Sequence, residues 1–69
     1  MEYNEARRLV RKFVENLVCD YELEYTEVLH QSTGYICAMN DLGCFKGWDS
    51  EKFDGILRTR NAALKLWFD

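Results

Sequence analysis

Residues 21–42 carry apolar or small side chains at alternating spacings of four and three positions, and this spacing constrains the fold more than any other feature of the chain. The series ends immediately before Gly43. An α-helix places such positions on one face, whereas a strand requires alternation at every second residue. The spacing therefore predicts a helical middle segment. The positions are Tyr21, Tyr25, Val28, Ser32, Tyr35, Met39 and Leu42.

The segments on either side have the same helical periodicity. A first helix is predicted over residues 3–19, with Asn4 as a candidate N-cap. The last helix is predicted to begin after a cap at Asp49 or Ser50 and to run to the end of the chain, with Phe53 and Trp67 in the core. These elements predict an all-α bundle of three to four helices in a single domain over residues 1–69.

An α-β-β-α fold is the alternative. Residues 21–24 alternate apolar and acidic side chains, and residues 32–34 could form a hairpin turn. The helical spacing continues across that turn, and Gly43 suits the C′ position of a helix, so we favour a helix. Gly34 costs about 1 kcal/mol inside a helix relative to alanine, and we therefore expect a break or kink near residues 32–34. Whether residues 21–42 form one helix or two stays open.

The length and the cysteine content indicate a small intracellular protein. A 69-residue chain buries only about 60% of the surface that it exposes when unfolded, so it gains from a staple or a partner. Its three cysteines are an odd number and contain no CxxC pair, which favours a reducing compartment. No apolar run approaches the ~20 residues of a membrane span, and the polar, acidic first residues are unlike a signal peptide. We expect a soluble cytoplasmic protein without membrane contact.

The aromatic content is high for such a short chain. Four Phe, four Tyr and two Trp residues each bring roughly 150–250 Å² to be hidden. A core of this size has little room for all of them, so some are expected at a surface that a partner or a second copy covers. We select Phe45 and Trp48 in the predicted loop and Phe68 near the end of the chain, and we expect a homodimer.

The charge is concentrated in the middle of the chain. Residues 21–44 contain four acidic residues and no Lys or Arg. This segment repels phosphate, which argues against nucleic acid, and suits a basic surface on another protein. The acidic candidates for partner binding are Glu22, Glu24, Glu27 and Asp41.

No catalytic, cofactor or metal signature is present. His30, Cys37 and Cys44 are spaced seven residues apart. Seven residues of helix rise about 10.5 Å, whereas zinc ligands must all reach within about 2.3 Å of the ion. His30 has only Glu27 one turn before it, which is common on surface helices. We therefore predict neither an enzyme nor a cofactor or metal site.

A helix-turn-helix DNA-binding regulator is the alternative function. The last helix could present Arg58, Arg60, Asn61 and Lys65 to a groove of DNA. However, the connection over residues 43–49 is longer than the 3–4-residue turn of that motif, and the net charge is −3. A second basic strip combines Arg7, Arg8, Arg11 and Lys12, whose acidic neighbours favour a solvated helix face.

Residues 33–43 (Thr-Gly-Tyr-Ile-Cys-Ala-Met-Asn-Asp-Leu-Gly), followed after a loop by residues 49–53 (Asp-Ser-Glu-Lys-Phe), resemble a pattern in small helical proteins of phages and mobile elements. The resemblance covers about a third of the chain. It implies a helix with an Asp-Leu-Gly cap that leads into a second capped helix. It further implies inhibition of a host or defence protein, or regulation of a larger assembly, in the cytoplasm of a host cell. We predict a non-enzymatic protein–protein interaction module that occludes a basic surface.

Overall fold

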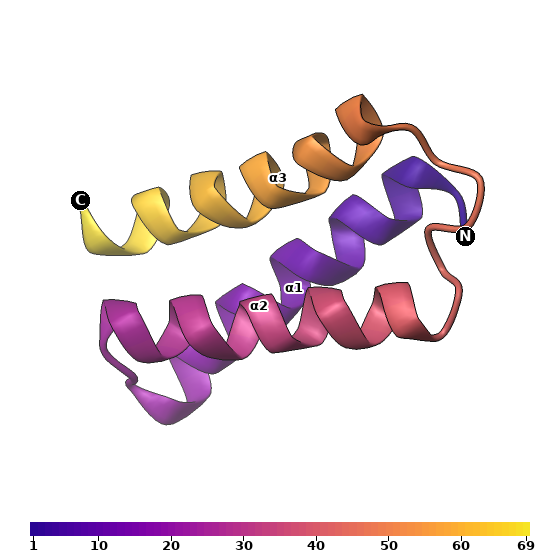
Figure 1. Cartoon of the computed structure of the whole chain (residues 1–69). Helices are drawn as coiled ribbons and strands as arrows, with labels where there is room; N and C mark the ends of the chain where they lie inside the picture. Colours follow the sequence, from indigo (N-terminus) through magenta and orange to yellow (C-terminus); the bar gives the residue numbers. More distant parts are fainter.

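The chain folds as three helices joined by two short connections. The computed structural model describes residues 1–69, and its helices are α1 (Tyr3–Tyr21), α2 (Tyr25–Asp41) and α3 (Ser50–Phe68). Successive helices run in opposite directions and form an up-down-up bundle of 35 × 20 × 17 Å (Figure 1). The predicted all-α bundle is confirmed, and the α-β-β-α alternative is wrong because the chain contains no strand.

All three helices pack against one another, and α1 makes the most extensive contacts, above all with α3. The buried side chains of α1 recur every three or four residues, as the periodicity predicted. They divide between two apolar clusters along the bundle. The first cluster contains Ala6, Val10, Ile36, Met39, Phe45 and Ile56. The second contains Val14, Leu17, Val28, Ala63 and Leu64.

α2 passes through Gly34 as one continuous helix, so the expected break near residues 32–34 does not occur. Val28, Ile36 and Met39 are buried on the helix face that meets the core. Burial of such side chains stabilises by roughly 1.5–3 kcal/mol each, which exceeds the cost of one helical glycine. The predicted middle helix over residues 21–42 extends too far at both ends. Tyr21 belongs to α1, and Leu42 lies beyond α2 and is 83% exposed.

The helix ends follow the predicted capping residues in two of three cases. Asp49 caps α3, since its carboxylate accepts a hydrogen bond of 2.9 Å from the backbone N–H of Lys52. Gly43, with φ +82°, ends α2 in a Schellman motif in which the N–H of Cys44 donates to the carbonyl of Met39. Asn4 is not a cap, because α1 already begins at Tyr3.

None of the three helices has the combination of length and apolar character that crossing a membrane requires.

Candidate protein-binding surface

The end of the bundle with the α1–α2 connection also carries the last turn of α3 (Figure 1). Glu22, which follows α1, adopts the left-handed conformation (φ 51°, ψ 41°) and turns the chain back. Leu23 is half-buried against the second apolar cluster, and α2 begins at Tyr25. Only residues 22–24 connect the two helices, so little chain covers this end. We call it the open end; it comprises Asp20, Tyr21, Glu22, Glu24, Tyr25, Glu27, Trp67 and Phe68.

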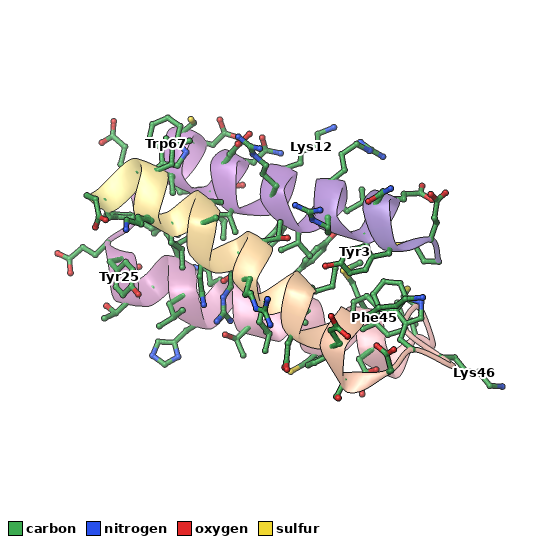
Figure 2. All side chains as sticks on the ribbon, turned by 90° about the horizontal axis from the view of Figure 1, so that it is seen from above. Tyr3, Lys12, Tyr25, Phe45, Lys46 and Trp67 are labelled. Carbon is green, nitrogen blue, oxygen red and sulfur yellow. The ribbon has the colours of Figure 1, made fainter.

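Four aromatic side chains of the open end are exposed to solvent. The exposed fractions are 66% for Tyr21, 48% for Tyr25, 45% for Trp67 and 37% for Phe68. Tyr25 and Phe68 pack edge to face with ring centroids 5.7 Å apart, so α2 and α3 contribute to one aromatic surface. Figure 2 shows Tyr25 and Trp67 at this end, on opposite sides of the last turn of α3.

The carboxylates of the open end have no basic partner. The structure contains two ion pairs, Arg11–Glu15 at 2.9 Å and Lys65–Asp69 at 3.9 Å, and neither involves residues 20–27. No Lys or Arg occurs between Lys12 and Lys46. Carboxylates beside aromatic rings suit Arg or Lys side chains, since the cation can pair with the carboxylate while it stacks on the ring.

A groove of about 620 Å³ between α1 and α2 extends the open end along the side of the bundle. Its walls combine apolar and amide side chains with the carboxylate of Asp20. Such a wall can accept the apolar stem of a long basic side chain while the carboxylate faces its charged head. The lining residues are Phe13, Asn16, Leu17, Asp20, Tyr21, Leu23 and Gln31.

The structure divides the residues selected from the sequence between the two ends of the molecule. Glu22, Glu24, Glu27 and Phe68 lie at the open end. Asp41, Phe45 and Trp48 lie at the opposite end, in or beside the loop over residues 42–49 (Figures 1 and 2). They are therefore separated by most of the 35 Å length of the bundle and do not form one surface.

Phe45 is buried, so the prediction that it lies at a partner-binding surface is wrong. It is only 5% exposed and belongs to the first apolar cluster. Trp48 is half-buried, with its ring 4.8 Å from that of Phe45 and 5.5 Å from that of Tyr3. The loop folds back over the bundle because Phe45 fills the space between the helices, so Phe45 is not available for the interface expected in this loop.

Sequence reasoning missed the exposure of three aromatic residues. Trp67 was expected in the core, because it continues the spacing of Phe53 and Leu64. Its exposure contradicts this, since α3 extends to where the neighbouring helices no longer cover it (Figure 1). Tyr21 and Tyr25 were likewise placed on a helix seam. Their position at helix ends was the signal that could have revealed this surface.

One of the basic residues predicted for a DNA-reading face, Arg60, is occupied by hydrogen bonds within the chain. Arg60 is half-buried and donates to Thr33 Oγ1 at 2.7 Å, and it also donates to Asn61 Oδ1 at 3.1 and 3.2 Å. Its guanidinium is thus engaged between α3 and α2. The connection between these helices, residues 42–49, exceeds the 3–4 residues of a helix-turn-helix.

His30, Cys37 and Cys44 do not belong to a cluster that could hold a metal ion. No group of three or more His, Cys, Asp and Glu side chains is arranged to hold a metal ion. Cys19, Cys37 and Cys44 are all free thiols, and the first two are exposed.

No protein-family model, curated protein or solved structure matches the chain.

Proposed function

We propose that this chain is a small protein-binding module whose open end binds an Arg- or Lys-rich surface of another protein. The observation that supports this most is the exposure of four aromatic rings beside carboxylates that have no basic partner. Aromatic side chains are frequent at the energetic centre of interfaces, and carboxylates select a positively charged partner.

The dimensions of the open end limit the interface that it can form. A cross-section of 20 × 17 Å corresponds to about 340 Å², whereas a typical specific interface buries about 800 Å² on each partner. A partner must therefore also occupy the groove between α1 and α2, which starts at Asp20 and Tyr21. This favours a partner with a protruding basic segment over one with a flat face.

Binding of this kind would make the chain an inhibitor or regulator that occludes a basic surface of a host or defence protein. The sequence resemblance to small phage and mobile-element proteins supports this role, as does the net charge of −3. A cytoplasmic location is part of the proposal, and the exposed free thiols of Cys19 and Cys37 support it.

A homodimer is the other way to cover the exposed aromatic rings. Two open ends that meet face to face would bring their carboxylates together, and salt screens such repulsion. Self-association through the open end should therefore increase with salt, whereas binding to a basic partner should weaken. Sedimentation velocity of the chain at low and high salt measures whether a dimer forms and whether it increases with salt.

Affinity capture from a bacterial lysate, with and without nuclease, tests the proposal. The wild-type chain is compared with a Glu24→Lys/Glu27→Lys variant at the open end and with an Asp41→Lys/Glu51→Lys variant that has the same charge change elsewhere. All four side chains are exposed, so circular dichroism should show an unchanged helix content.

We expect the wild type and the Asp41→Lys/Glu51→Lys variant to retain one protein in near-stoichiometric amount, regardless of nuclease. The Glu24→Lys/Glu27→Lys variant should lose it. Equal recovery with both variants would rule out the open end as the binding surface. Recovery that disappears with nuclease would instead favour the DNA-binding alternative.

A further inference from the structure

A second groove, of about 500 Å³, lies between α1 and α3 and has a different chemistry from the open end. It contains three arginine side chains and no carboxylate. The α1 side is basic and the α3 side is mostly apolar. The lining residues are Asn4, Arg7, Arg8, Arg11, Thr59, Ala62, Ala63 and Leu66.

Two of the arginine side chains are held in place through their Nε atoms. Arg7 Nε donates to Thr59 Oγ1 at 3.0 Å, and Thr59 is itself held by its bond to the carbonyl of Gly55 at 2.9 Å. Arg11 Nε donates to Glu15 Oε1 at 2.9 Å. The terminal Nη atoms of both arginines make no hydrogen bond within the chain, and Arg8 makes none at all. The free edges of the three guanidinium groups can each donate two hydrogen bonds to one carboxylate.

The α3 side of the groove offers an apolar floor. Ala63 is buried, Ala62 is exposed, and Leu66 is 68% exposed. Small residues let another helix approach closely, and an exposed leucine provides apolar area for it to cover. α1 and α3 pack side by side (Figure 1), and a fourth helix could fill the groove between them, as in a four-helix bundle.

We propose that this groove is a docking site for an acidic amphipathic helix of a partner protein. Apolar side chains of that helix would pack on Ala62 and Leu66, and its Glu or Asp side chains would pair with Arg7, Arg8 and Arg11. The three arginines span residues 7–11 of α1, a rise of about 6 Å or roughly one helical turn, so carboxylates at i and i+4 of the partner fit.

An acidic helix explains both halves of the groove, whereas a phosphate ligand would use the arginines and leave the exposed Leu66 without a role. The docking site lies on another face than the open end and has the opposite charge. It therefore does not rest on the function proposed above, and the two surfaces together would let one chain contact two different proteins.

A synthetic helical peptide provides a defined probe. It carries Leu at spacings of three and four residues with Glu on both flanks, and its matched control has Gln in place of every Glu. Binding is measured by calorimetry and by NMR shifts of the Arg Nε–H groups. Arg8→Glu is compared with Lys12→Glu, which makes the same charge change on the same helix. Lys12 does not line the groove and points away from α3 (Figure 2).

The floor is tested by Leu66→Ser against Leu42→Ser, since both leucines are exposed but Leu42 lies beyond α2, outside the groove. The four substituted residues are exposed, and their side chains form no hydrogen bond or ion pair within the chain. Circular dichroism should therefore show an intact fold for each variant. The residues are Arg8, Lys12, Leu42 and Leu66.

We expect Arg8→Glu and Leu66→Ser each to weaken binding of the Glu peptide by about fivefold or more, while Lys12→Glu and Leu42→Ser change it by less than about twofold. The proposal is overturned if the Glu peptide does not saturate the protein by about 1 mM, or if the Gln peptide binds equally well. It is also overturned if Arg8→Glu and Lys12→Glu have the same effect. Displacement of the peptide by tripolyphosphate, with no effect of Leu66→Ser, would identify a simple anion site instead.

Discussion

The two ends of the bundle are both rich in aromatic residues, but at one end these residues are buried or half-buried, whereas at the other they are exposed. At the end opposite the open end, Tyr3, Phe45, Trp48 and Phe53 pack on one another, with ring centroids 4.8 to 5.7 Å apart. We call these four residues, together with the loop 42–49, the closed end. At the open end, only Tyr25 and Phe68 contact each other, and both remain exposed.

The difference between the ends follows from the length of the connecting chain. The closed end is covered by eight residues, 42–49, which are enough to fold Phe45 into the first apolar cluster. The open end has only residues 22–24 between its helices. Three residues can reverse the chain direction but cannot return over the end of a bundle about 20 Å wide. Aromatic content alone therefore does not identify an interaction surface; the amount of chain available to cover it must also be known.

The largest expected difference between the ends is in the cost of removing one phenylalanine. Phe45→Ala should lower the free energy of unfolding by about 3–5 kcal/mol, because it leaves a cavity in the first apolar cluster. Phe68→Ala should cost less, roughly 1–2 kcal/mol, because the residue is already 37% exposed and its removal leaves no enclosed cavity. Urea unfolding followed by circular dichroism measures both. Similar costs for the two variants would mean that the ends are equally packed.

Two glycine-to-alanine substitutions are expected to change the stability of the fold in opposite directions, one at the closed end and one within α2. A Cβ at Gly55 would collide with the ring and hydroxyl of Tyr3, which belongs to the closed end. Gly55→Ala should thus destabilise the fold by about 1–2 kcal/mol, since overpacking outweighs the gain in helix propensity. Gly34 has open space around it within α2, so Gly34→Ala should stabilise by about 1 kcal/mol. Thermal unfolding of the pair provides the measurement, and a stabilising Gly55→Ala would show that Tyr3 moves aside freely.

The smallest expected difference concerns the helix caps. The Asp49 carboxylate bonds to the backbone N–H of Lys52, whereas Glu24 at the start of α2 makes no capping bond with its side chain. Asp49→Ala should therefore cost about 1 kcal/mol, and Glu24→Ala only a few tenths of a kcal/mol. Paired urea titrations can resolve this difference. A larger loss for Glu24→Ala would contradict an uncapped start of α2.

Much of the fold could be predicted from local chemistry. The spacing of Val10, Val14 and Leu17 predicts which face of α1 is buried, and Asp49 and Gly43 mark a helix start and a helix end through hydrogen bonds made within a few residues. The continuity of α2 through Gly34 was not predictable in this way. It depends on contacts between α2 and the other two helices, which compensate the local cost of glycine.

The candidate site was less predictable than the fold. The acidic residues Glu22, Glu24 and Glu27 are exposed as their charge requires, but the sequence grouped them with Asp41 and with the loop aromatics at the other end of the molecule. It also placed Trp67 in the core on the basis of spacing alone. Spacing describes the face of one helix, whereas exposure depends on where the neighbouring helices end.

Local sequence is sufficient to predict the amphipathic helices of this chain, the cap that begins α3 and the glycine that ends α2, and the acidic middle segment. These properties depend on residues within one or two turns of each other. The exposure of individual aromatic rings, and the groove that three arginines of α1 form with Leu66 of α3, become apparent only in the folded molecule. Burial and surface complementarity arise between segments distant in the chain, so they follow from how the helices and their connections fit together in space.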